Sequence, residues 1–227
     1  LLKSERTGLK KSLTLQTNEV TANIIGDFKI LELPDAVKVL LSKYYPTYIK
    51  APRYIVKSRQ DFSFSVKTGN IENYIKLIDK DLGGFNNADI SGNFNLGNYT
   101  MNLKAAVPAF SYGNKVFTNA VINGTGTGDT LSAEISAEDI AVNDSLHFPD
   151  TKLRIAAHND ISLIKLNTST NQVFGDAELN ASVQTLSDGV KIHFYPSSFI
   201  INNKKWQLYR DGALTLRKDF NDANAVK

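Results

Sequence analysis

The fold class follows most directly from residues 131–137, which read LSAEISA. Apolar side chains stand at every second position, and serine or glutamate stands between them. Side chains of a β-strand point alternately to its two faces, so this pattern predicts a strand with one apolar face and one face in water. The same alternation continues in both directions along the chain, for example in residues 101–107, MNLKAAV.

Runs of this kind recur about every ten residues, at the spacing typical of all-β proteins. We expect turn dipeptides such as Asn123-Gly124 and Asp188-Gly189 to separate them, because their residues tolerate the positive φ of tight hairpins. We therefore expect a mainly β protein, with a long, twisted, antiparallel sheet that forms a groove. Residues 161–166 read ISLIKL and suggest a bulge, so the sequence leaves open which of them face the groove.

Two segments near the N-terminus depart from this alternation. Residues 33–49 and 70–82 carry apolar side chains at helical spacing, and Gly83-Gly84 is expected to end the second segment. We expect two short amphipathic helices, each packed as a lid on the apolar face of the sheet. Three lysines among the tyrosines of the first segment support a second interpretation, a helix that lies on a membrane surface.

The sequence contains no linker, so we expect one continuous domain over residues 1–227. We expect a helix-containing β part over 1–85, an all-β meander over 86–218 and a frayed polar tail over 219–227. The chain begins without an initiator Met or a signal-peptide pattern, and we expect it to be an internal piece of a longer protein. No apolar stretch approaches the roughly 20 residues of a membrane-spanning helix.

Composition excludes several kinds of chemistry. The absence of Cys excludes disulfides, thiolate zinc sites and cysteine nucleophiles. His147, His158 and His193 are isolated, and the glycine-rich residues 124–128 precede a strand rather than the helix that a phosphate loop must open. We therefore expect no catalytic residues, no metal site and no cofactor, and the chain is predicted not to be an enzyme.

The net charge of +3 is unevenly distributed. Residues 1–60 hold eleven Lys or Arg and five Asp or Glu, whereas residues 61–227 hold fifteen and eighteen. A basic end suits anionic lipid head groups or nucleic acid. Aromatic residues do not interleave with the basic ones as a nucleic-acid platform requires, so we expect no nucleic-acid partner.

The candidate functional residues are the apolar residues of one strand face. Several positions on that face are small, including Gly92, Ala105, Ala137 and Ala181, which favours unfilled volume over a self-filling core. A closed sandwich, in which the alanines face large partners, is the competing interpretation. The residues expected to line the groove are Ile90, Phe94, Leu96, Met101, Leu103, Leu131, Ile135, Leu153, Ile155, Leu179, Val183, Ile192 and Phe194.

Several phrases of the sequence are similar to those of a known family. They are residues 87–94 (NADISGNF), 131–135 (LSAEI), 148–153 (FPDTKL), 174–181 (FGDAELNA) and 196–202 (PSSFIIN), followed by Trp206 and Asp211-Gly212. This succession resembles the TamB branch of the AsmA-like proteins, especially its Bacteroidota members. The turn triplets at Thr130 and Ser145, each Asp-Thr/Ser-Leu, resemble the acceptors of periplasmic O-glycosylation in Bacteroidota.

The resemblance implies a lengthwise groove in a periplasmic protein that is anchored in the inner membrane by a helix absent from this chain. It implies a role in moving phospholipid acyl chains between the inner and outer membranes. A first alternative is a scaffold that assists outer-membrane β-barrel proteins or autotransporters by strand augmentation, with a TamA-like barrel protein as partner. A second alternative is a closed, lipocalin-like binding domain, in which the first and last strands pair.

Overall fold

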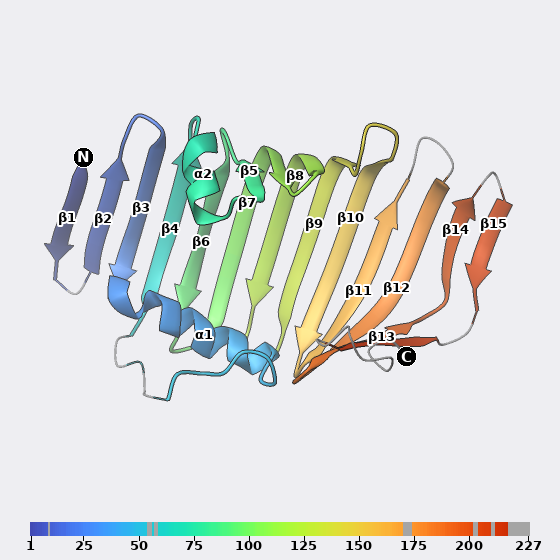
Figure 1. Cartoon of the computed structure of the whole chain (residues 1–227). Helices are drawn as coiled ribbons and strands as arrows, with labels where there is room; N and C mark the ends of the chain where they lie inside the picture. The colour runs from blue at the N-terminus through green and yellow to red at the C-terminus, as the bar shows by residue number, and fades with distance from the viewer. Residues whose placement is uncertain are drawn as a thin grey trace.

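The computed structural model describes residues 1–8, 10–53, 56, 59–169, 174–201, 204–209 and 212–217, and the predicted tail at 219–227 lies outside them. The described chain forms one large antiparallel sheet that does not close on itself (Figure 1). This confirms the predicted fold class. Along the main path the sheet is on the order of 55 Å long, given strands about 4.8 Å apart.

Strands follow each other in the sheet almost in chain order. The strands are β1 (Leu2–Thr7), β2 (Lys10–Gln16), β3 (Val20–Asp27), β4 (Asp61–Thr68), β5 (Leu82–Gly84), β6 (Asp89–Asn95), β7 (Thr100–Tyr112), β8 (Lys115–Gly126), β9 (Leu131–Ala141), β10 (His147–His158), β11 (Ile161–Thr168), β12 (Phe174–Leu186), β13 (Gly189–Phe194), β14 (Ser197–Ile201), β15 (Lys204–Leu208) and β16 (Ala213–Arg217). The main path runs β1-β2-β3-β4-β6-β7-β8-β9-β10-β11-β12-β13-β16, while β5 joins β7 and the β14–β15 hairpin joins β12.

The helices begin close to where the sequence predicts them but end earlier. A 3-10 turn, η1 (Ile30–Glu32), leads into α1 (Leu33–Tyr44), and α2 spans Glu72–Ile78. Pro46 explains the end of α1, because a proline disfavours helical geometry in the residue before it. At the end of α2, Asp79 is already extended, and the Gly83-Gly84 pair belongs to β5 rather than stopping the helix.

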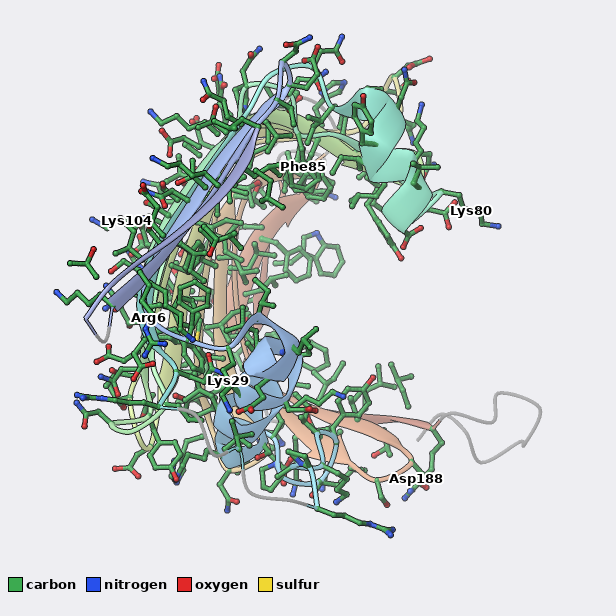
Figure 2. All side chains as sticks on the ribbon, turned by 90° about the vertical axis from the view of Figure 1, so that its left-hand side faces the viewer. Arg6, Lys29, Lys80, Phe85, Lys104 and Asp188 are labelled. Carbon is green, nitrogen blue, oxygen red and sulfur yellow. The ribbon has the colours of Figure 1, made fainter. Side chains whose placement is uncertain are left out.

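The sheet is curved, with both helices on its concave side (Figure 2). Four neighbouring strands are interrupted at aligned positions, at Pro108, Asn119, Glu138 and Asp150. Asn119 and Asp150 adopt positive φ of 48° and 49°, and proline has no N–H to donate. Such interruptions let strands bend. Beyond them, the stacked rings of Phe110 and Phe117 lie with centroids 4.4 Å apart.

The one cluster of buried apolar side chains among the described residues lies where α1 meets the sheet. Ala36, Leu40 and Tyr44 are fully buried there, against Phe94 of β6. Among the described residues, the largest fully buried side chains are Tyr44, Leu40 and Gln60. The helix therefore packs as a lid over one part of the apolar face.

Polar bonds fix the end of α1 to the far half of the sheet. The Tyr44 hydroxyl donates to the carbonyl of Thr127, and the Tyr45 hydroxyl lies 2.9 Å from that of Ser162. The Thr47 hydroxyl donates to Asp160 over 2.7 Å. Since these contacts come from two hairpins, β8–β9 and β10–β11, α1 holds a defined place across the sheet.

The protein exposes more surface than a compact fold would. The chain has 14409 Å² of accessible surface, whereas a compact monomer of this mass has about 10,300 Å². A single sheet without a covering second sheet exposes more surface than a compact fold of the same mass.

Candidate functional site

The concave face of the sheet carries three apolar rows, each made of residues that stand directly opposite one another on successive strands. The first row is Val66, Ile90, Ala105, Ile122, Ile135, Leu153, Leu166 and Leu179. The second row is Phe64, Gly92, Leu103, Gly124, Ala133, Ile155, Ile164, Ala181 and Phe194. The third row is Phe62, Phe94, Met101, Gly126, Leu131, Ala157, Ser162, Val183, Ile192 and Leu214. Opposite residues in antiparallel strands share a face, so the rows form one continuous surface.

The structure places all but one of the predicted groove residues in these three rows. The exception is Leu96, which follows β6 and packs against the cluster under α1. The structure also decides which of residues 161–166 face the groove. Ile164 and Leu166 lie in the rows, whereas Ile161 and Leu163 lie on the outer face. The two outer residues are 44% and 53% exposed.

The rows divide into a covered part and an uncovered part. Phe94 belongs to the cluster under α1, and Leu96, Met101 and Leu131 pack against that cluster. The bulky residues farther along, from Ile135 to Phe194, are only half-buried. All described strands belong to one hydrogen-bonded sheet that does not close, so none of them forms a second sheet over the rows. The closed sandwich is therefore wrong.

Three of the small positions, Gly92, Ala105 and Ala137, provide no free space, contrary to the sequence argument. A Cβ at Gly92 would lie 2.9 Å from the Phe64 ring and 2.2 Å from the Asn102 carbonyl oxygen, so the neighbours already fill that position. Ala105 and Ala137 are buried between larger residues, with 8% and 6% exposure. The open surface results instead from the absence of a covering layer over the bulky members of the rows.

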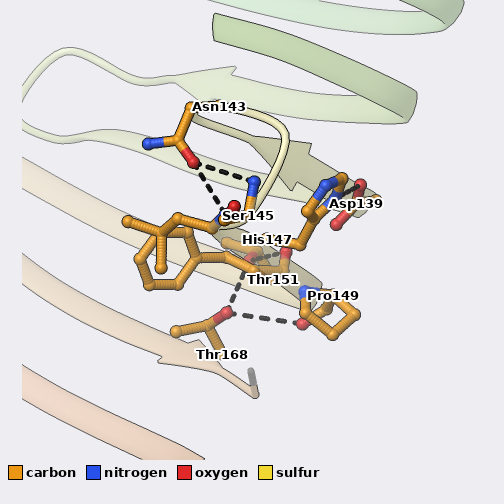
Figure 3. A network of polar contacts seen from close by, with 9 residues as sticks. Asp139, Asn143, Ser145, His147, Pro149, Thr151 and Thr168 are labelled. Carbon is orange, nitrogen blue, oxygen red and sulfur yellow. Dashed lines mark hydrogen bonds and ion pairs between the residues drawn. The ribbon is translucent and has the colours of Figure 1, made fainter. Parts of the chain in front are cut away.

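Several polar groups at the upper rim bond to one another, although Asp139 Oδ1 is buried without a hydrogen-bond partner (Figure 3). The hydroxyls of Thr151 and Thr168 lie 2.7 Å apart, and they lie 2.9 Å and 3.3 Å from the carbonyls of Phe148 and Pro149. These two residues come just before the interruption at Asp150, in the part of β10 that is paired with β9 but not with β11. The two threonine hydroxyls therefore have a structural role, because they bond to backbone carbonyls next to the bend in β10.

Other candidate positions lie in turns. Thr130 is half-buried in the β8–β9 turn and hydrogen-bonds through its backbone to Thr127. Ser145 is exposed in the β9–β10 turn, where Asn143 Oδ1 accepts the backbone N–H groups of Ser145 and Leu146 over 2.9 Å (Figure 3). No described residues form a group of three potential metal ligands. His147 instead pairs with Asp139 at 2.7 Å.

The outer face is charged and internally paired. Cross-strand ion pairs join Arg154 to Glu134 over 3.2 Å and Lys165 to Glu178 over 2.7 Å. Hydrogen bonds from Lys165 and Asn180 lower the pKa of Glu178. The two faces of the sheet therefore differ sharply in polarity, as the alternating sequence predicts.

Sequence reasoning missed one apolar cleft beside the third row. It has a volume of 620 Å³ and lies between the loop after α1 and the lower ends of β12, β13 and β16. Tyr45, Ile49, Val190 and Leu216 contribute to its walls. No local pattern could have indicated it, since its walls come from segments more than 130 residues apart.

Neither membrane-spanning helices nor known relatives add to the description of the site. Within the described part of the chain, no helix is long and apolar enough to cross a bilayer. Comparisons with known proteins found no matching family model, no matching curated protein and no matching solved structure.

Proposed function

We propose that this chain is a segment of a bridge-like lipid transport protein, and that its three apolar rows carry phospholipid acyl chains. One observation supports this above all: rows of large aliphatic side chains continue from strand to strand, and beyond α1 they are only half-buried by the described part of the chain. Removing a CH₂ group from water yields about 0.8 kcal/mol, so an acyl chain lying along the rows stabilises both itself and the sheet. The polar head group stays at the open side.

This function needs neither catalysis nor a cofactor, and we propose none. The resemblance to the TamB branch supports a periplasmic location in a protein anchored in the inner membrane. The open ends of the sheet fit the proposal, because acyl chains can enter and leave a surface that is not closed. Among the described strands, β1 pairs only with β2 and β16 only with β13, which argues against the closed lipocalin-like alternative.

The proposal is tested by native mass spectrometry of the purified chain, with Ile135→Asp as the variant. Ile135 stands in the first row and is half-buried, so a carboxylate there should repel acyl chains and remove bound phospholipid from the spectrum. Leu163→Asp is the matched control, because Leu163 lies on the outer face and is 53% exposed. Phospholipid retained equally by all three proteins would contradict the proposal.

A second function, the scaffold for outer-membrane barrel proteins, has its own supporting observation. All six residues of β1 are exposed, and one edge of that strand is unpaired among the described strands. Such an edge can accept a further strand from a partner such as a TamA-like barrel protein. This function would tolerate Ile135→Asp but would be lost in Ser4→Pro, since proline removes an N–H from the edge.

A further inference from the structure

Residues 29–53 carry a group of large apolar side chains in water. Leu31 is 90% exposed, Tyr48 66%, Ile30 51% and Val37 41%. Single exposed apolar residues are common on folded proteins, but several on one segment indicate a surface that binds a membrane or another molecule.

The geometry of α1 explains why these side chains point outward. Ala36, Leu40 and Tyr44 stand four residues apart and fill the side of the helix that packs on the sheet. Val37 and Lys38 lie on other sides of the helix and are exposed. Because bonds from Tyr44, Tyr45 and Thr47 fix the end of the helix, the exposed side is presented in a constant orientation.

The same segment is basic. Its five cations are Lys29, Lys38, Lys43, Lys50 and Arg53, and its two acids are Glu32 and Asp35. Lys29 lies 3.2 Å from Glu32, and Lys38 lies 3.9 Å from Asp35. Such surface pairs are weak, and Lys43 lies 3.8 Å from the centre of the Tyr99 ring, so the segment keeps an excess of three positive charges.

We propose that the exposed side of residues 29–53, which we call the basic–apolar strip, docks on a bilayer surface with anionic head groups. Cations beside exposed apolar residues on a helix are the combination that binds such interfaces. A second copy of this chain is a less favourable partner for the strip, because two positively charged strips in contact would repel each other. The strip is separate from the three apolar rows, so the proposal does not depend on acyl chains binding there.

The test is vesicle flotation of the purified chain with phosphatidylcholine, with and without phosphatidylglycerol. We expect flotation with the anionic vesicles only, weakened by added salt. Leu31→Glu and Lys38→Glu should each reduce the partition coefficient about fivefold or more. Both side chains are exposed, so neither change should alter thermal unfolding.

Matched controls are Leu163→Glu and Lys104→Glu on the outer face, which should float like the unmodified chain; Figure 2 shows Lys104 on the side opposite α1. The proposal is overturned if flotation does not depend on phosphatidylglycerol, or if the controls weaken it as much as the strip variants. It is also overturned if Leu31→Glu abolishes self-association instead. Ile135→Asp separates the two proposals, because it should remove bound phospholipid and leave flotation intact.

Discussion

Gly92 and Gly124 stand in the same apolar row, but only at Gly92 would an added Cβ clash with its neighbours. A Cβ at Gly124 would meet Leu103 at 3.6 Å, an ordinary contact, whereas at Gly92 the backbone of Asn102 is far too close. We expect Gly92→Ala to lower the free energy of unfolding by about 1–3 kcal/mol and Gly124→Ala to change it by less than about 1 kcal/mol. Urea denaturation measures the free energy of unfolding of both variants. Equal decreases in the two variants would contradict the tight packing described around Gly92.

Tyr44 links stability to pH. Burial, and then repulsion from Asp129, raises its pKa above the ordinary value of 10.0. The unfolded chain therefore releases this proton at lower pH than the folded chain, so the contribution to stability is complete below about pH 10 and is lost as the pH rises through the folded pKa.

Tyr44→Phe removes this titration along with the hydroxyl bond to Thr127. We expect the variant to be less stable at neutral pH by about 0.5–1.5 kcal/mol. The difference from the unmodified protein should shrink above about pH 10. Urea unfolding at neutral and at alkaline pH measures both. A difference that grows with pH would refute the assigned direction of the pKa shift.

Among the elements, α1 is the one that makes a conventional core. Leu40 is fully buried under it, whereas Val37, on the same helix, is 41% exposed. Leu40→Ala should lower the free energy of unfolding by about 2–5 kcal/mol, and Val37→Ala should cost much less, since little packing is lost there. Thermal and urea unfolding report the contrast, and similar losses for both variants would mean that α1 does not pack as described.

Strand parity could be predicted from the sequence, but the ends and interruptions of elements could not. Alternation alone put Ile135 and Leu153 on one face, since period two is local information. The aligned irregularities at Asn119 and Asp150 depend on the register between strands, which no single run of residues specifies. Gly83-Gly84 looked like a helix stop because its pairing with β7 is equally non-local.

For the molecule as a whole, the open shape depends on what is missing from one face of the sheet. The sequence supplied enough apolar residues for either an uncovered groove or a closed sandwich, and the argument from small residues did not separate them. What separates them is that the described strands pair almost in chain order, in one sheet that does not close. That property belongs to the topology of the whole chain, so it became visible only in three dimensions.

The central claim is that acyl chains lie on the three apolar rows and not on the outer face. Photocrosslinking tests it most directly, with a benzophenone amino acid placed at Ile135 or at Leu163 in the chain expressed in cells. Both sites lie in the middle of a strand, and they point to opposite faces of the sheet. We predict phospholipid adducts at position 135 and none at position 163. Adducts at both positions alike, or only at position 163, would contradict the account.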